Sequence, residues 1–172
     1  DKVYPPLGNL YLKSAIEKEL PNVNIDLCDD YDLSQPERFE PYDLIGLSIM
    51  TPQRKEAYAV LEAIKKAYPK KLVAAGGPHV LYYQAESKAQ PFDFVVAGEA
   101  EKILPRIIRG ESERFEFGSL SRQELDDMPR PDRTSIKSQN MLRGYNYKLN
   151  NLNSTTAFFA RGCTEQCTFC ED

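Results

Sequence analysis

Three cysteines near the end of the sequence have the spacing of a metal centre. They lie in "RGCTEQCTFC" (residues 161–170) as Cys163, Cys167 and Cys170, which is a C-x3-C-x2-C pattern. Three thiolates at one centre match a 4Fe-4S cluster with one iron left open to a small molecule. A structural zinc site usually has four ligands in paired C-x2-C units, so zinc would need a fourth ligand from elsewhere. The spacing favours the iron–sulfur cluster, with zinc or inert thiols as the alternatives.

Small, hydroxyl-bearing and glycine residues gather in three loops that each follow an apolar run. The loops are "SIMTPQ" (48–53), "GGPHV" (76–80) and "GEAE" (98–101). Glycine lets a backbone approach a ligand closely, although in any one loop it also simply makes a turn. Three such loops at one sheet edge favour a nucleotide-like or large planar ligand. The candidate contacts are Ser48, Met50, Thr51, Gly76, Gly77, Pro78, His79, Gly98 and Glu99.

Two single residues have alternative interpretations. His79 is the one histidine of the sequence, and a hydrogen-bonding role is favoured over a role as metal or corrinoid ligand. Cys28 stands apart from the other cysteines, and we expect a small buried side chain that follows a strand.

Strands and helices that alternate along the chain must position these loops. Buried strands are predicted from continuous apolar runs and helices from apolar residues at helical spacing. This alternation predicts an α/β fold with a Rossmann-like or flavodoxin-like parallel sheet and right-handed crossovers. The expected strands are 24–29, 42–50, 71–77 and 92–99, and the expected helices are 7–20, 54–68, 82–88 and 101–110.

The start of the sequence differs from the usual order of such a sheet. "DKVYPPLGNLYL" enters a helix almost directly, whereas a flavodoxin-like sheet opens with a central strand. The strands near Leu27 and Leu47 would then lack their shared neighbour. We therefore expect a fragment that is cut at both ends, inactive and poorly soluble by itself.

The chain after the predicted sheet divides into a connector and the start of a second domain. We expect an α/β domain over residues 1–117, a linker over 118–153 with little periodicity, and a new domain over 154–172. Tyr145 and Tyr147 are compatible with a small strand. A β-rich run from Thr155 to Ala160 leads straight into the cysteine loop.

Composition narrows the class of protein. The net charge of -4 argues against binding nucleic acid through a broad basic surface. No apolar run approaches the roughly 18–20 residues of a membrane helix, and the sequence lacks a basic-then-apolar signal peptide. A cytoplasmic protein is the expectation, and clustered thiols then indicate a metal site instead of disulfides.

The motif "CTEQCTFC" resembles the C-x3-C-x-aromatic-C signature of radical S-adenosylmethionine enzymes. Five preceding stretches resemble the members of that family that carry an N-terminal cobalamin-binding domain. Together they cover nearly the whole chain. They are "PPLGNLYL", "YDLIGLSIMTPQ", "VAAGGPHV", "FDFVVAGEAEKILP" and "DDMPRPDR".

The resemblance implies a role for each matching residue. Cys163, Cys167 and Cys170 would ligate three irons of a 4Fe-4S cluster, and the fourth iron would chelate S-adenosylmethionine. Phe169 would lie beside the adenine. One electron, from a donor such as flavodoxin or ferredoxin, would cleave the sulfonium and give a 5′-deoxyadenosyl radical. The loop residues, among them Ser48, Thr51, Gly76, Gly77 and Gly98, would line cobalamin.

The implied activity is methyl transfer to an unactivated carbon, or a related radical reaction, on a small-molecule or peptide substrate that the sequence does not identify. The D-x-H-x-x-G motif that gives a histidine to cobalt in other cobalamin proteins is absent, so cobalt would be bound without a protein imidazole. Two alternatives remain open. In one, the first domain binds a substrate or a partner without a corrinoid, and in the other zinc stabilises a non-catalytic protein.

Overall fold

A computed structural model describes residues 6–28, 35–135, 157–162 and 167–168. By its internal contacts the chain divides into two units, residues 8–135 and residues 1–7 with 136–172. The first contains the sheet and is the part that positions the candidate loops.

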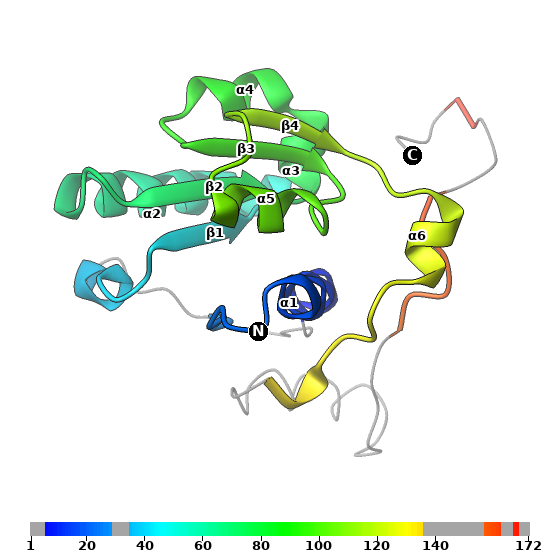
Figure 1. Cartoon of the computed structure of the whole chain (residues 1–172). Helices are drawn as coiled ribbons and strands as arrows, with labels where there is room; N and C mark the ends of the chain where they lie inside the picture. Colours follow the sequence, from blue (N-terminus) through cyan, green and yellow to red (C-terminus); the bar gives the residue numbers. More distant parts are fainter. Residues whose placement is uncertain (1–5, 29–34, 136–156, 163–166, 169–172) are drawn as a thin grey trace, which may run out of the picture. The chain divides into compact units, whose positions relative to one another are not determined.

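Four parallel strands form one sheet in the order of the chain. They are β1 (Leu44–Ser48), β2 (Leu72–Gly76), β3 (Phe94–Gly98) and β4 (Phe115–Gly118), as Figure 1 shows. Ser48 is in register with Gly76. Gly98 is in register with Gly118 at the other side of the sheet. The predicted α/β class with a parallel sheet is confirmed.

Three helices cover one face of the sheet. They are α2 (Arg54–Ala67), α3 (Pro78–Tyr82) and α4 (Gln84–Ala89). The apolar residues of α2 recur at helical spacing, and this stripe packs on alternate side chains of the strands. Burial of each large aliphatic side chain contributes about 1.5–3 kcal/mol. The core on this face consists of Ile45, Ile49, Ala57, Val60, Leu61, Ile64, Val73, Ala75, Val80, Phe92, Val95 and Ala97.

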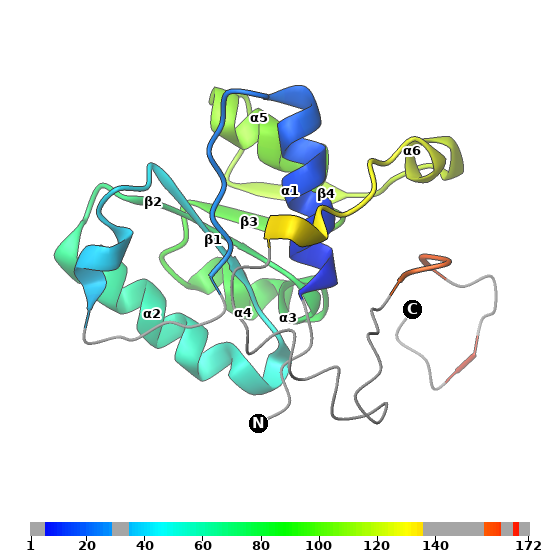
Figure 2. The same ribbon diagram turned by 90° about the horizontal axis from the view of Figure 1, so that it is seen from below.

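Helices α1 (Leu7–Glu19) and α5 (Ile103–Arg109) lie on the opposite face, as the two views agree (Figures 1 and 2). Val96 of β3 packs there with Ile103 and Ile107, and Leu12 of α1 joins this second cluster. Gly110 ends α5 with φ of +75°, and its N–H reaches the Ile107 carbonyl oxygen at 3.0 Å. The left-handed conformation requires glycine at this helix end, as the sequence predicts.

The three crossovers do not share one hand. The strands advance in one direction across the sheet, while α2 to α4 cover one face and α5 covers the other. The β3–α5–β4 connection therefore has the opposite hand to the two before it. This differs from the expectation of right-handed crossovers throughout. One face of β3 already packs against α3, and Val96 on the other face packs against Ile103 and Ile107 of α5.

Asp93 fixes the amino end of the sheet. Its Oδ2 accepts hydrogen bonds from the Val73 backbone N–H at 2.7 Å and from Lys65 Nζ at 2.6 Å. The Lys65 ammonium also donates to the Lys71 carbonyl oxygen at 2.8 Å. The half-buried ion pair thus connects α2 to the starts of β2 and β3.

Two predicted strands are wrong. Residues 24–28 show an alternation of exposed and half-buried side chains but form no strand, because no strand among the described residues lies beside them to complete a ladder. Cys28 is accordingly exposed, which corrects the expectation of a buried thiol. Residues 157–160, the described part of the β-rich run, also form no strand. Tyr145 and Tyr147 lie outside the described residues.

The first part of the predicted linker is ordered. It contains α6 (Arg122–Asp126), which begins with a capping box in which the Ser121 hydroxyl accepts from Glu124 N–H and the Glu124 carboxylate accepts from Ser121 N–H. Lys102 pairs with Glu124, and Lys18 Nζ donates to the Asp127 carbonyl oxygen at 3.1 Å.

Farther along, the Asp132 N–H donates to Ser14 Oγ at 2.9 Å. The 3₁₀ turn η3 (Arg133–Ser135) closes the unit, and two further 3₁₀ turns, η1 (Pro36–Phe39) and η2 (Thr51–Gln53), flank β1. Residues 119–135 are therefore bound by polar contacts to α1 and to Lys102, the residue before α5.

Candidate functional site

The carboxyl ends of β1 and β2 bring two of the three predicted loops together. The Ile49 N–H donates to the Gly76 carbonyl oxygen at 2.8 Å, and the His79 N–H donates to the Ile49 carbonyl oxygen at 2.9 Å. Ser48 and Met50 are exposed beside them, and Met50 has 48% of its surface accessible. These two loops therefore form one continuous edge, as predicted.

The face of the sheet near this edge is open. A Cβ on Gly46 would meet no atom within 4 Å, and a Cβ on Gly76 would meet only the Val96 carbonyl oxygen at 3.6 Å, which is ordinary contact. Gly46 and Gly76 lie on the same face as Ser48, since side chains alternate along a strand, whereas Ala74 on this face is buried. This cradle of small residues allows a flat ligand to approach the sheet backbone.

Gly77 has a different role from Gly76. Its φ is +94°, and an added Cβ would lie 2.7 Å from the Ile49 nitrogen and 3.1 Å from Ser48 Oγ. The close approach of the two loops requires glycine here, because any side chain would meet backbone. Pro78 follows at the first position of α3 and is exposed. Gly77 therefore shapes the edge, whatever the edge binds.

His79 lies beneath the edge and not on it. Its side chain is 0% exposed. Nε2 lies 3.0 Å from the Tyr58 hydroxyl oxygen, and Nδ1 lies 3.4 Å from Thr51 Oγ1. The ring also stacks on Tyr83, with centroids 4.9 Å apart. The hydrogen-bonding role favoured by the sequence is present, and the imidazole does not reach the surface of this edge.

Two charged side chains, Glu86 and Arg54, lie near the buried His79 ring. Glu86 Oε1 lies 3.7 Å from His79 Nε2 and 3.5 Å from Arg54 Nε. Arg54 Nη1 also donates to the Thr51 carbonyl oxygen at 3.0 Å. Burial raises the pKa of the Tyr58 phenol, and the nearby Glu86 carboxylate raises it further. Tyr58 therefore stays protonated and remains a hydrogen-bond donor at neutral pH.

The third predicted loop pairs with β4 and not with the other two. The Glu99 N–H donates to the Gly118 carbonyl oxygen at 3.0 Å, and Glu99 Oε2 accepts from the Leu120 N–H at 2.7 Å. Gly98 has φ of +79°, and its Cβ position would lie 2.3 Å from the Gly118 carbonyl oxygen. Gly98 and Glu99 thus fix the path of the chain from β4, which is the turn-making role of the alternative interpretation.

The cysteine motif is described only in part. Cys167 is exposed and carries a free thiol, while Cys163, Cys170 and Phe169 lie outside the described residues. Gly162, which precedes the motif, has φ of +74°, a conformation that favours glycine. Among the residues that the structure describes, no group of three or more metal-ligating side chains is present. The cluster therefore remains a prediction from the spacing.

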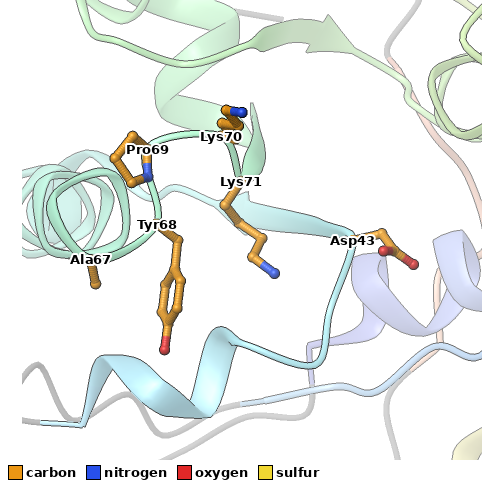
Figure 3. A pocket seen from close by; sticks show the side chains of 6 residues that line it. All are labelled: Asp43, Ala67, Tyr68, Pro69, Lys70 and Lys71. Atoms are coloured by element: carbon orange, nitrogen blue, oxygen red, sulfur yellow. The ribbon is translucent and has the colours of Figure 1, made fainter.

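A hollow of about 510 Å³ lies at the opposite end of the sheet (Figure 3). It is lined by Asp43 before β1 and by the loop between α2 and β2, where the Lys71 ammonium lies 5.5 Å above the Tyr68 ring. Lys71 Nζ donates to the Glu40 carbonyl oxygen at 2.8 Å, so its charge is already bound to backbone. Ligand sites of open α/β sheets lie at the carboxyl ends of strands, which excludes this hollow as the predicted edge.

Residues 1–108 match the family described as "B12 binding domain". The match covers β1 to β3, α1 to α4, all of α5 but its last residue, and all three loops. The chain belongs to the B12-binding domain family. The open edge at Gly46 and Gly76 lies within the matched residues of this B12-binding domain.

Curated relatives of this B12-binding domain are methyltransferases by name. An uncharacterized methyltransferase of Pyrococcus horikoshii is 30% identical over 96% of this chain and 40% of that protein. Bacteriochlorophyllide d C-8(2)-methyltransferase of Chlorobaculum tepidum is 22% identical over 99% of this chain and 37% of its own length. The chain thus spans less than half the length of these relatives.

A solved structure, the N-terminal domain of a hypothetical protein of Thermotoga maritima, matches 59% of this chain and 83% of its own with a TM-score of 0.48 and 18% identity.

In the described part of this B12-binding domain, no helix has the length and apolar character that a membrane crossing requires.

Proposed function

We propose that this chain is part of a cobalamin-dependent methyltransferase. The observation that carries the proposal is the match of residues 1–108 to the B12-binding domain family. The names of the curated relatives support methyl transfer as the reaction class. When bound, cobalamin would supply a carrier for the methyl group.

The described residues fit a corrinoid at the β1–β2 edge. Gly46 and Gly76 leave the sheet face open to a large flat ligand, and Ser48 offers an exposed hydroxyl at the same edge. Met50, Thr51 and Pro78 border it. Cobalt would be held without a protein imidazole, because the side chain of His79 is buried and hydrogen-bonded at both ring nitrogens.

The finer proposal is a radical S-adenosylmethionine enzyme. It is supported by the C-x3-C-x2-C spacing of Cys163, Cys167 and Cys170, which supplies three thiolates and leaves one iron open. A 4Fe-4S cluster held there would supply one electron to S-adenosylmethionine, and it would take that electron from a donor such as flavodoxin or ferredoxin. Phe169 would lie against the adenine. The substrate is a small molecule or a peptide.

A second candidate is a radical enzyme whose first domain binds substrate or partner without a corrinoid. The burial of His79, the one histidine of the sequence, favours it, because no imidazole then reaches this edge to ligate cobalt. Both candidates would hold the iron–sulfur cluster, and only the first would also bind cobalamin.

The test is metal analysis of the anaerobically purified full-length protein. The proposal expects about four irons per chain after reconstitution with iron and sulfide, saturable uptake of hydroxocobalamin, and cleavage of S-adenosylmethionine. Iron without any cobalamin uptake would favour the binding-module candidate. Zinc in place of iron would contradict both.

A further inference from the structure

We infer that His79 is a positioning residue that fixes the β1–α2 loop at the candidate corrinoid edge through Thr51. The inference rests on the proposed function for the identity of the ligand, but its structural part does not. The two nitrogens of the His79 imidazole contact residues of two different elements, α2 and η2.

Burial of a polar ring needs a reason. The His79 ring is 0% exposed, and burying a polar group without hydrogen bonds destabilises a protein. Both nitrogens have partners, since Nε2 lies 3.0 Å from the Tyr58 hydroxyl on α2 and Nδ1 lies 3.4 Å from Thr51 Oγ1 in η2. Each hydroxyl can donate or accept, so either neutral tautomer satisfies both ends.

The loop on the Nδ1 side has few other restraints. The η2 turn has no buried residue and no side-chain cap, and Met50 before it is 48% exposed. Its own hydrogen bonds are local, from Gln53 N–H to the Met50 carbonyl oxygen at 2.9 Å and from Arg54 Nη1 to the Thr51 carbonyl oxygen at 3.0 Å. The Thr51 side chain is therefore the link from this turn to the buried ring.

His79 connects the same two loops through its backbone. Its N–H donates to the Ile49 carbonyl oxygen at 2.9 Å, directly before the turn. The backbone bond fixes the β1 end, and the imidazole fixes the turn that follows. Together they set where Met50 and Thr51 stand relative to the open face at Gly76.

Four variants of the full-length protein separate positioning from simple core filling. Thr51→Val removes the hydroxyl and keeps the shape, while Thr51→Ser keeps the hydroxyl. In His79→Asn the amide group replaces Nδ1, and in His79→Gln it replaces Nε2. Both His79 variants lose ring volume, so both are expected to lower the melting temperature, and only His79→Gln should release Thr51.

The first readout is hydrogen exchange at the Gln53 and Arg54 amides. Loss of one hydrogen bond of about 1 kcal/mol corresponds to about fivefold faster exchange. We expect this increase in Thr51→Val and His79→Gln and wild-type exchange in Thr51→Ser and His79→Asn. Equal exchange in all four variants would overturn the inference, because His79 would then only fill the core.

The second readout is hydroxocobalamin affinity, which we expect to fall about fivefold in the same two variants. If the wild-type protein takes up no cobalamin, the proposed function fails, while the exchange contrast still decides whether His79 positions the loop. If the wild-type protein binds cobalamin and the exchange contrast appears without any change in affinity, the assignment of this loop to the corrinoid edge is overturned.

Discussion

Gly98 and Gly118 face each other across β3 and β4 so closely that a Cβ on Gly98 would lie 2.3 Å from the Gly118 carbonyl oxygen. On Gly118, a Cβ would lie 1.6 Å from the Glu99 carbonyl oxygen. At these two glycines the backbones of the two segments are therefore in direct contact. The pair therefore belongs to the fold, although "GEAE" suggested a ligand loop.

Gly118→Ala should destabilise the domain strongly. The added methyl group meets backbone atoms that cannot rotate away, so β4 must shift from β3, and we expect a loss of at least about 2 kcal/mol, at the upper end of ordinary point mutations. Chemical denaturation of the full-length protein measures it. Gly46→Ala is the matched control, because its Cβ meets nothing within 4 Å, and its unfolding should stay within about 1 kcal/mol of wild type. Equal losses at both positions would contradict the model of a backbone contact.

Gly76→Leu should weaken cobalamin binding without loss of the fold. The Cβ makes ordinary contact at 3.6 Å, and the rest of the side chain would occupy the open face, so we expect hydroxocobalamin affinity to fall at least tenfold, or about 1.4 kcal/mol. Spectrophotometric titration measures it. Ala67→Leu, in the hollow at the opposite end of the sheet (Figure 3), should leave affinity unchanged.

Gly77→Ala is the contrasting change. Although the sequence placed Gly76 and Gly77 alike among the candidate contacts, Gly77 has φ of +94° and its Cβ position lies 2.7 Å from the Ile49 nitrogen. Backbone strain of this kind costs about 1–3 kcal/mol. We expect a lower melting temperature in the absence of any ligand, so a Gly77 variant that unfolds like wild type would show that the two loops separate easily.

Cysteine substitution tests the predicted cluster. Cys163→Ala, Cys167→Ala or Cys170→Ala in the full-length protein should each abolish reductive cleavage of S-adenosylmethionine, because each removes a thiolate ligand. Iron content and 5′-deoxyadenosine formation are the measurements. Cys28→Ala is the control, since Cys28 is an exposed residue of the first unit and should not affect either. Cleavage that survives Cys167→Ala would refute the radical mechanism.

Acid should release α6 from the domain. The Lys102 ammonium, the Ser121 N–H and the Ser121 hydroxyl lower the pKa of Glu124 from its ordinary value of 4.5 to about 2. A lowered pKa stabilises the folded state above the unfolded value, so the contribution is complete above about pH 4.5 and disappears as the pH falls toward 2. Amide exchange in α6, measured relative to exchange in α2 as the internal reference, should therefore increase as the pH falls over this range.

Glu124→Gln removes the titration. At pH 7 its α6 exchange relative to α2 should already equal the ratio of the wild type near pH 2, and this ratio should change little with pH. A wild-type α6 that exchanges at the same rate relative to α2 across this range would show that the capping box does not depend on the charge.

Sequence patterns predicted the parts of the fold that depend on local periodicity. The strand around Ile45 was predicted correctly because burial on both faces gives a continuous apolar run. The helix with Val60, Leu61 and Ile64 was predicted correctly because burial of one helix face gives apolar residues at helical spacing. The alternation at Ile25 and Leu27 misled, since a half-buried side chain does not guarantee a strand partner. β4 was missed because four residues, "FEFG", are too short for periodicity.

The sequence predicted where the candidate site lies, at the carboxyl ends of the strands, but not the role of each residue in it. The loops at Ser48 and Gly76 meet, as parallel strands require. No spacing in the sequence shows that Tyr58, on α2, and Thr51 both reach His79, because that cluster exists only after three elements pack. The capping box at Ser121 and Glu124 was readable from the S-x-x-E pattern, and it would have shown that the linker begins with a helix.

The polar contacts between α1 and residues from the end of α5 onward impose an order on folding during synthesis. Glu19, Lys18 and Ser14 of α1 bind Arg109, Asp127 and Asp132, which are separated from them by 90, 109 and 118 residues. At about 5–20 residues per second, the ribosome completes those partners on the order of ten seconds after α1 emerges. Contacts of such long range also slow the folding step itself. We expect α1 to be the last helix to dock on the sheet, and its apolar side, with Leu10 and Ile16, to be the surface that a chaperone meets on the nascent chain.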